Sequence, residues 1–143
     1  MMEWMILPYK RYFDFSGRSR RKEYWMFALL NAIIASVAVA LMISQIFTYR
    51  EAAMQQQSDG PGAGFWLGIV ILGVFFLGTF IPSLAVQVRR FHDQDKSGWF
   101  LLLNFVPYVG GLIVFVFMCL EGTRGPNRFG PDPKDPSSAE VFA

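Results

Sequence analysis

The sequence has few charged residues, one cysteine and one histidine. Asp, Glu, Lys and Arg make up 17% of its 143 residues, against roughly 25% in ordinary soluble proteins. A single cysteine, Cys119, excludes an intramolecular disulfide, and with His92 as the sole histidine the chain alone cannot form a Cys/His metal cluster. We therefore expect no metal site and no cofactor.

The charges that are present avoid three long segments. Residues 24–49, 60–88 and 97–120 contain no Asp, Glu, Lys or Arg. Each segment reaches the roughly 20 residues that cross a hydrocarbon core of about 30 Å, and none has the polar face of a soluble helix. The sequence therefore predicts an all-α integral membrane protein, a single membrane domain over residues 1–143 with transmembrane helices at 24–47, 65–88 and 98–120.

The segments outside these helices differ in character. Residues 1–23 are apolar and aromatic and then strongly basic, which is typical of a segment lying in the membrane interface; the alternative is a poorly ordered terminus. The connection at 48–64 is polar and then rich in Gly and Pro, so we expect it to be flexible. Residues 121–143 form a Pro/Gly-rich tail that cannot be helical, with Phe129 as its expected anchor.

The third apolar segment is interrupted at its centre by Pro107 to Gly111. It is either one kinked transmembrane helix or a re-entrant hairpin whose halves reach about 13 Å into the bilayer. A hairpin leaves non-helical backbone that protein or water has to cover, so we favour the kinked helix.

The distribution of basic residues predicts the orientation. Three spans place nine Lys and Arg on the side of the N-terminus and four on the other side, so the N-terminus is expected in the cytoplasm. The hairpin places twelve against one and leads to the same orientation. The two alternatives differ in the side on which the C-terminus lies.

The first predicted helix carries small residues four positions apart, which form a ridge on one face. Such a ridge lets another helix approach closely in lipid, so we expect helix packing, within the chain or in a homo-oligomer, at Ala28, Ala32, Ser36 and Ala40.

The segment between the second and third helices, residues 88–100, gathers most of the versatile side chains. Its arginines follow the second helix directly, where the helix dipole favours cations. Asp93 or Asp95 is expected to pair with a basic residue of the N-terminal segment, where Ser19 is expected to cap the first helix. Ser97 is expected to cap the third helix, and Trp99 to anchor it at the interface.

A catalytic interpretation of this segment rests on His92, which would shuttle a proton while Asp93 orients it. Adjacent residues rarely orient one another, and no Ser or Cys nucleophile is placed beside them. We therefore assign no catalytic residue. The candidate lipid- or partner-binding face consists of Arg18, Arg20, Arg21, Arg89, Arg90, His92, Asp93 and Trp99.

Three stretches, FSGRSRRKEYW (15–25), VRRFHDQDKSGW (88–99) and GTRGPNRFGPDP (122–133), resemble the bacterial inner-membrane family catalogued as domain of unknown function 805, with its YhaH-type and YhaI-type members. Phe91 replaces a more usual leucine, and Trp99-Phe100 a more usual pair of tryptophans. The resemblance implies a multi-pass protein of the inner (plasma) membrane, and it implies no established activity.

The sequence is compatible with two functions, and we rank a third below them. The first is a non-catalytic module whose basic and aromatic cytoplasmic face binds anionic lipid headgroups or a membrane partner. The second is an oligomeric permeation or carrier component, suggested by the Gly- and Pro-interrupted helices. The third is a lipid-headgroup enzyme that uses His92. A nucleic-acid partner is not expected.

Overall fold

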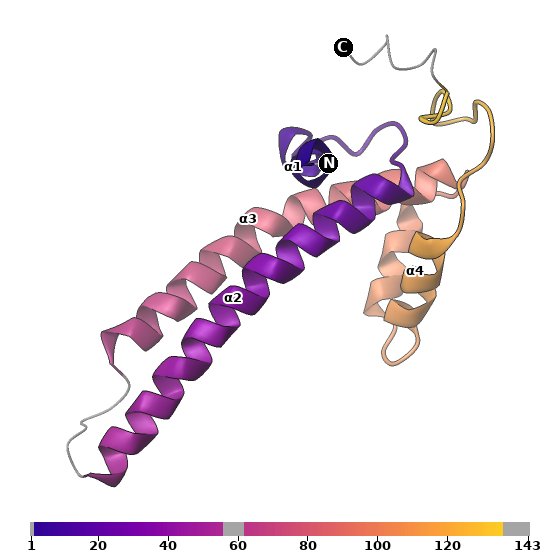
Figure 1. Ribbon diagram of the computed structural model, residues 1–143. Coiled ribbons are helices and arrows are strands. Elements are labelled where there is room, and N and C mark those ends of the chain that lie inside the picture. Colours follow the sequence, from indigo (N-terminus) through magenta and orange to yellow (C-terminus); the bar gives the residue numbers. More distant parts are fainter. Residues whose placement is uncertain (1, 56–61, 136–143) are drawn as a thin grey trace. The chain divides into compact units, whose positions relative to one another are not determined.

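The structure is a computed structural model that describes residues 2–55 and 62–135. All regular elements in these residues are helices, and one isolated antiparallel bridge joins Asn127 and Gly130. In order they are α1 (Met2–Lys10), α2 (Arg21–Met54), α3 (Ala63–Asp93), the 3-10 helix η1 (Gly98–Phe105) and α4 (Gly110–Cys119) (Figure 1). This confirms the all-α prediction. The central part of the predicted flexible connection (56–61) and the end of the tail (136–143) lie outside the described residues. The ends of this connection belong to α2 and α3.

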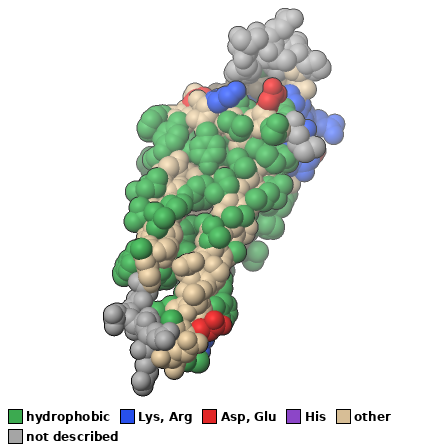
Figure 2. Space-filling view, turned by 60° about the vertical axis from the view of Figure 1, so that its left-hand side comes forward, with side chains coloured by type: hydrophobic (Ala, Val, Ile, Leu, Met, Phe, Trp, Pro, Cys, Tyr) green, Lys and Arg blue, Asp and Glu red, His purple; other side chains and the backbone are tan. Residues whose placement is uncertain are grey.

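Two helices are long and apolar enough to cross a membrane. α2 has 34 residues and α3 has 31, or about 51 and 46 Å at 1.5 Å per residue. Large apolar side chains along them are exposed, and most of the surface visible in Figure 2 is hydrophobic. Such a surface suits lipid and not water. The first two predicted transmembrane helices are therefore present as helices.

The chain divides into two compact units, and each long helix contributes to both. One unit comprises residues Leu29–Phe80 and the other Met1–Ala28 with Ile81–Ala143. Within Leu29–Phe80, α2 and α3 lie side by side (Figure 1), and a Cβ added at Gly64 or Gly68 would come within 2.8 Å of Gln45 or Met42. The two helices thus come close to each other at these glycines of α3. Of the predicted ridge, Ala32, Ser36 and Ala40 are exposed, so its packing role stays a prediction.

The third apolar segment folds back on itself. η1 and α4 pack against each other, and residues 107–109 form the turn between them. Tyr108 adopts a positive φ of 67°, and a side chain at Gly110 would overlap the carbonyl oxygen of Leu103. The third segment is therefore a hairpin of two short helices, which corrects the favoured prediction of one kinked helix. Three spans are not confirmed.

Three hydrogen bonds within the turn satisfy part of its non-helical backbone, which lowers the cost that disfavours a hairpin. The amide of Val106 donates to Leu103 O at 3.0 Å, Val109 to Pro107 O at 2.8 Å and Gly110 to Val106 O at 3.0 Å. Pro107 has no amide hydrogen to satisfy and keeps the residue before it out of the helical region. Ser97 accepts a hydrogen bond from the amide of Trp99 at 3.4 Å, which confirms the predicted cap.

The smaller elements pack around the ends of the long helices. Phe91 of α3 forms a core with Val114 and Met118 of α4, so the hairpin is attached to the end of α3. At the N-terminus, residues 2–10 form helix α1 and not an irregular terminus. Tyr9 of α1 contacts Phe27 of α2 edge to face, with 5.1 Å between ring centroids.

Candidate functional site

Three segments far apart in the sequence meet where α2 begins and α3 ends. They are the N-terminal arm (residues 11–20), the end of α3, and the C-terminal segment (residues 120–133). Arg18, Arg89 and Arg90 lie between them with Glu23 and Asp93, and all five are buried. We call these five residues the arginine cluster. Buried charges are costly unless they are paired and hydrogen-bonded, so each partner matters.

Asp93 is the central acceptor of the cluster. Arg18 donates from Nε to Asp93 Oδ1 at 3.0 Å, and Arg90 donates from Nη1 to Asp93 Oδ2 at 2.5 Å. The predicted pairing of Asp93 with the arm is therefore confirmed. Arg90 also donates to the carbonyl of Leu120, where the C-terminal segment begins. One carboxylate thus connects the arm to α3, and its partner Arg90 connects α3 to the chain beyond α4.

Arg18 connects the arm to the C-terminal segment directly. Its guanidinium donates to the carbonyl oxygens of Thr123 at 2.6 Å and Gly125 at 2.7 Å. The amide of Thr123 in turn donates to the carbonyl of Asp93 at 2.8 Å. A side chain at Gly122 would overlap the Asp93 carboxylate. The segment therefore passes so close to Asp93 that only glycine fits there.

Arg89 and Glu23 form the second buried pair. Arg89 Nη2 donates to Glu23 Oε1 at 3.0 Å, and Glu23 lies in the first turn of α2. Ser19 donates its amide to the carbonyl of Arg89 at 3.2 Å, but its Oγ has no hydrogen-bond partner among the described residues. The predicted side-chain cap by Ser19 is therefore not formed; α2 begins at Arg21, one residue further along the chain than such a cap requires.

His92 and Asp93 do not act as a pair. His92 Nδ1 lies 3.2 Å from the carbonyl oxygen of Gly17, to which it donates in the matching tautomer, while both Asp93 oxygens are engaged by arginines. The imidazole stacks on Phe129, with 3.9 Å between ring centroids and 5° between planes. Phe129 is thus the anchor of the tail, as predicted. No group of three His, Cys, Asp or Glu positioned to hold a metal occurs in the described part of the chain.

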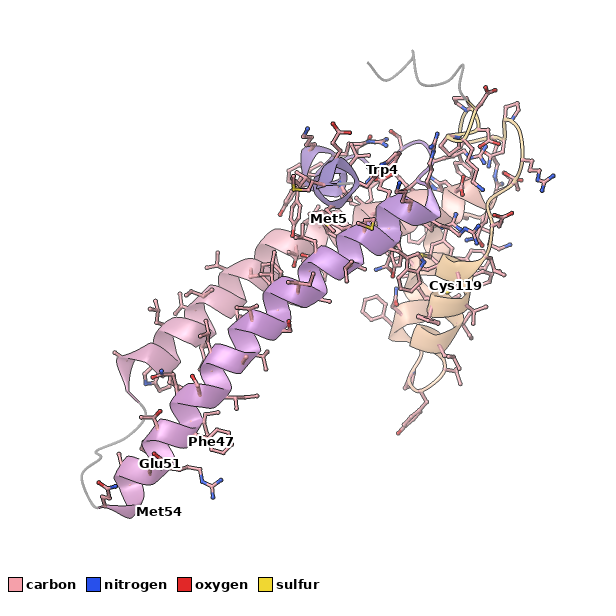
Figure 3. The ribbon with its side chains drawn as sticks, viewed as in Figure 1. Trp4, Met5, Phe47, Glu51, Met54 and Cys119 are labelled. Atoms are coloured by element: carbon pink, nitrogen blue, oxygen red, sulfur yellow. The ribbon has the colours of Figure 1, made fainter. Side chains whose placement is uncertain are left out.

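Only part of the predicted binding face is accessible. Four of its members, Arg18, Arg89, Arg90 and Asp93, are buried in the cluster, and Arg21 pairs with Glu121. Trp99 is 77% exposed. Arg20 and Lys22 lie over the ring of Trp4 at 5.5 and 5.7 Å from its centroid. Trp4 comes from α1, and Cys119 ends α4 (Figure 3).

Some members of the site had no clear signal in the sequence. The pairing of Glu23 with Arg89 joins residues 66 positions apart, and carbonyl acceptors such as those of Thr123 and Gly125 carry no side-chain signature. Gly122 is the one visible signal in the sequence, because only a residue without a side chain allows the backbone to pass so close to the Asp93 carboxylate.

Two carboxylates at the edge of the site have lowered pKa values. Partial burial raises the pKa of Asp14, but hydrogen bonds from Ser16 and Arg11 outweigh it and lower the pKa to about 2. A hydrogen bond from the backbone amide of Lys134 lowers the pKa of Asp132, which also accepts from the amide of Gly125 at 2.9 Å. Both carboxylates therefore fix turns in their ionised form.

A cavity of about 560 Å³ opens between α1, the arm, the start of α2 and the C-terminal segment. We call it the arm cavity. Its lining combines aromatic and aliphatic side chains, including Trp4, Leu7 and Phe129, with the guanidinium groups of Arg11, Arg18 and Arg20. The arrangement offers hydrogen-bond donors for an anion beside an apolar wall.

Comparison with known proteins gives a consistent result. The family model described as "Protein of unknown function (DUF805)" matches residues 12–131. Inner membrane protein YhaI of Escherichia coli (strain K12) is 41% identical over 135 residues, covering 93% of this chain and 97% of its own. Inner membrane protein YhaH of the same strain is 41% identical over 133 residues, covering 93% and 98%. No solved structure matches. Both of these relatives are named inner membrane proteins. The chain therefore belongs to the DUF805 family.

Proposed function

We propose that this chain is a non-catalytic inner-membrane module that binds anionic lipid headgroups through the accessible cations around its arginine cluster. The observation that carries the proposal is the division between its basic residues. The buried arginines are paired internally, whereas Arg20, Lys22 and Arg124 have no carboxylate within salt-bridge distance among the described residues. Trp4 and Trp99 lie in the same unit, and such amphipathic rings favour headgroup depth.

The topology that we propose follows from the same contacts. A membrane cannot separate groups that hydrogen-bond at 2.6 and 2.7 Å, as Arg18 does with Thr123 and Gly125, so the arm and the C-terminal segment share one side. The chain then crosses the membrane twice, and the hairpin enters and returns. Its ten-residue α4 is about 15 Å long, half of a core of about 30 Å.

The positive-inside rule places this shared side in the cytoplasm. The arrangement puts twelve basic residues there and leaves one, Arg50, on the other side. Both termini are then cytoplasmic, and the accessible cations face the leaflet surface. There the attraction amounts to about 1 kcal/mol for each basic residue near an anionic membrane.

A non-catalytic role is supported by the state of the candidate chemical groups. Asp93 is held by two arginines, and His92 is stacked on Phe129 and bonded to Gly17. General acid–base catalysis needs a group free to exchange a proton with a substrate. Both residues are instead used to hold segments together.

The test measures lipid selectivity in proteoliposomes. Spin-labelled phosphatidylglycerol and phosphatidylcholine report, by electron paramagnetic resonance, the relative association of each lipid with the protein. We expect a preference for phosphatidylglycerol that falls with salt and is largely lost in the triple variant Arg20→Gln, Lys22→Gln, Arg124→Gln. Arg50→Gln is the matched control. Equal association of both lipids with the wild-type protein would contradict the proposal.

A further inference from the structure

We propose that the arm cavity is a specific site for the phosphodiester headgroup of one anionic phospholipid. This inference rests on the proposed function and deepens it, because it names a lipid class and a place. A general attraction between surface cations and anionic lipids would select neither one lipid class nor one place on the protein.

The cavity has the size of a ligand site, and its polar wall is held in place by hydrogen bonds. Its volume of about 560 Å³ falls within the roughly 300–1,000 Å³ typical of small-molecule sites. Arg18, which lines it, is buried and fixed by four hydrogen bonds to Asp93, Thr123 and Gly125. The wall of the cavity is therefore preorganised by the arginine cluster.

Three arginines and two carboxylates line the cavity, so the lining itself carries one net positive charge. Arg11 pairs with Asp14 at 2.6 Å, and Arg18 pairs at 3.0 Å with Asp93, which Arg90 also holds. Glu23, the other acidic residue of the lining, pairs with Arg89 at 3.0 Å. Arg20 is the one arginine of the lining without a carboxylate partner in the described part of the chain.

A single excess cation matches a single negative charge. A phosphodiester carries one negative charge at neutral pH, whereas a phosphomonoester carries about 1.5 to 2. The planar guanidinium of Arg20 is suited to a two-point contact with phosphate oxygens. The chemistry of the lining thus favours the diester.

The apolar wall indicates a lipid as the source of this diester. Trp4, Leu7 and Phe129 line the cavity beside Arg20. On the same helix as Trp4, Met2 and Ile6 expose large apolar side chains to the surroundings. Met2 and Ile6 are each two positions from Trp4 and so lie on the opposite side of α1. The helix that carries the apolar wall of the cavity thus also presents an apolar side to the membrane, which a site for a soluble phosphodiester would not need.

The experiment counts lipid retained by the full-length protein. The protein is reconstituted with equal amounts of phosphatidylglycerol and phosphatidylcholine, extracted in detergent, and examined by native mass spectrometry. We expect one tightly held phosphatidylglycerol. Arg20→Gln should weaken its retention about tenfold, as expected for loss of a charge-assisted hydrogen bond. Leu7→Trp should weaken it similarly by filling the cavity with the charge unchanged.

Lys10→Gln is the matched control, because Lys10 is exposed on the same helix and does not line the cavity. Circular dichroism checks the fold of each variant, and Leu7→Phe replaces Leu7→Trp if the larger side chain disturbs it. Retention of the lipid by both cavity variants would overturn the inference. So would an equal loss in Lys10→Gln, which would leave the proposed surface binding standing.

A soluble competitor separates the two sources of the diester. Glycerophosphoglycerol carries the same headgroup without acyl chains. If it displaces phosphatidylglycerol at equal concentration, the site accepts a soluble phosphodiester and the assignment to lipid is overturned. We expect displacement to need a large excess.

Discussion

At the scale of single residues, the pair of Arg89 and Glu23 shows what the arginine cluster costs and contributes. The two side chains are 0% and 3% exposed and lie 3.0 Å apart. Removing the charge of Glu23 leaves the buried Arg89 with only a more distant carboxylate, that of Asp14 at 3.9 Å, so most of its compensation is lost. The pair therefore holds the arm end of α2 to α3 only as long as both partners are present.

The first prediction concerns this pair. Glu23→Gln should lower the free energy of unfolding by about 3 kcal/mol, because an unpaired buried charge costs about 3–5 kcal/mol. Thermal unfolding in detergent, followed by circular dichroism, measures the change. The double variant Arg89→Met, Glu23→Leu should lose less, since no charge is then left unpaired.

An exposed pair provides the comparison for this measurement. Arg128 and Asp95 lie 3.1 Å apart with side chains 60% and 47% exposed. Asp95→Asn should cost no more than about 1 kcal/mol, because exposed pairs are screened by solvent. If Glu23→Gln cost as little as Asp95→Asn, the buried cluster would not be a structural centre.

A second prediction uses the low pKa of Asp14. The folded-state pKa of about 2 lies below the value of about 3.9 for an unfolded aspartate. Ionised Asp14 therefore stabilises the folded arm above pH about 4, and this contribution is lost as the pH falls toward and below about 2. Urea unfolding between pH 5 and 2 should show a shallower loss of stability in Asp14→Asn than in the wild type. Parallel curves would show that Asp14 does not act in this way.

At the scale of elements, the hairpin of η1 and α4 replaces the helix that the hydropathy of residues 98–120 predicts. Hydropathy reports that a segment belongs in lipid, but it does not report whether the segment crosses. The outcome depends on the turn: Pro107 cannot donate, and Gly110 lets α4 approach the carbonyl of Leu103. Both features are local, yet their result is a reversal of chain direction.

The third prediction tests this turn. Gly110→Ala should destabilise the hairpin, because the added Cβ would overlap Leu103 O, whereas Gly111→Ala should be tolerated because nothing lies within 4 Å of its added Cβ. Protease cleavage near the turn in detergent, read by mass spectrometry, should increase in the first variant alone. Equal cleavage in both would mean that the close approach is not required.

At the scale of the whole molecule, the contacts of the arginine cluster bear on which side of the membrane each end of the chain lies. Arg18, Asp93 and Thr123 are joined in one network, although they come from the two ends of the chain and from the end of α3. A network of this kind requires that its segments are never separated by a bilayer. The network can therefore form only when the arm, the end of α3 and the C-terminal segment lie on the same side of the membrane.

The fourth prediction follows from this coupling. In a Cys119→Ser background, Lys10→Cys and Lys134→Cys should react with a membrane-impermeant maleimide from the same side, the cytoplasmic one. Right-side-out and inverted vesicles distinguish the two sides, and Arg50→Cys should label from the opposite side. Labelling of Lys134→Cys together with Arg50→Cys would restore the three-span arrangement.

The sequence by itself determined the membrane class and the helical content. Charge-free segments are long, contiguous signals, and lipid tolerates only internally bonded backbone, so their interpretation as helices holds for α2 and α3. It also determined some local contacts, such as the Ser97 cap, the pairing of Asp93 with the arm and the anchoring of the tail by Phe129.

Only the tertiary structure decided which arginines of the segment at 88–100 are accessible. From the sequence, Arg89 and Arg90 are expected to face lipid headgroups; in the structure both are fully buried. The reason is that Glu23, which pairs with Arg89, and the carbonyl of Leu120, which accepts from Arg90 in addition to Asp93, are supplied by segments 66 and 30 positions away. Whether a charge is paired depends on what surrounds it in space, and neither composition nor spacing along the chain contains that information.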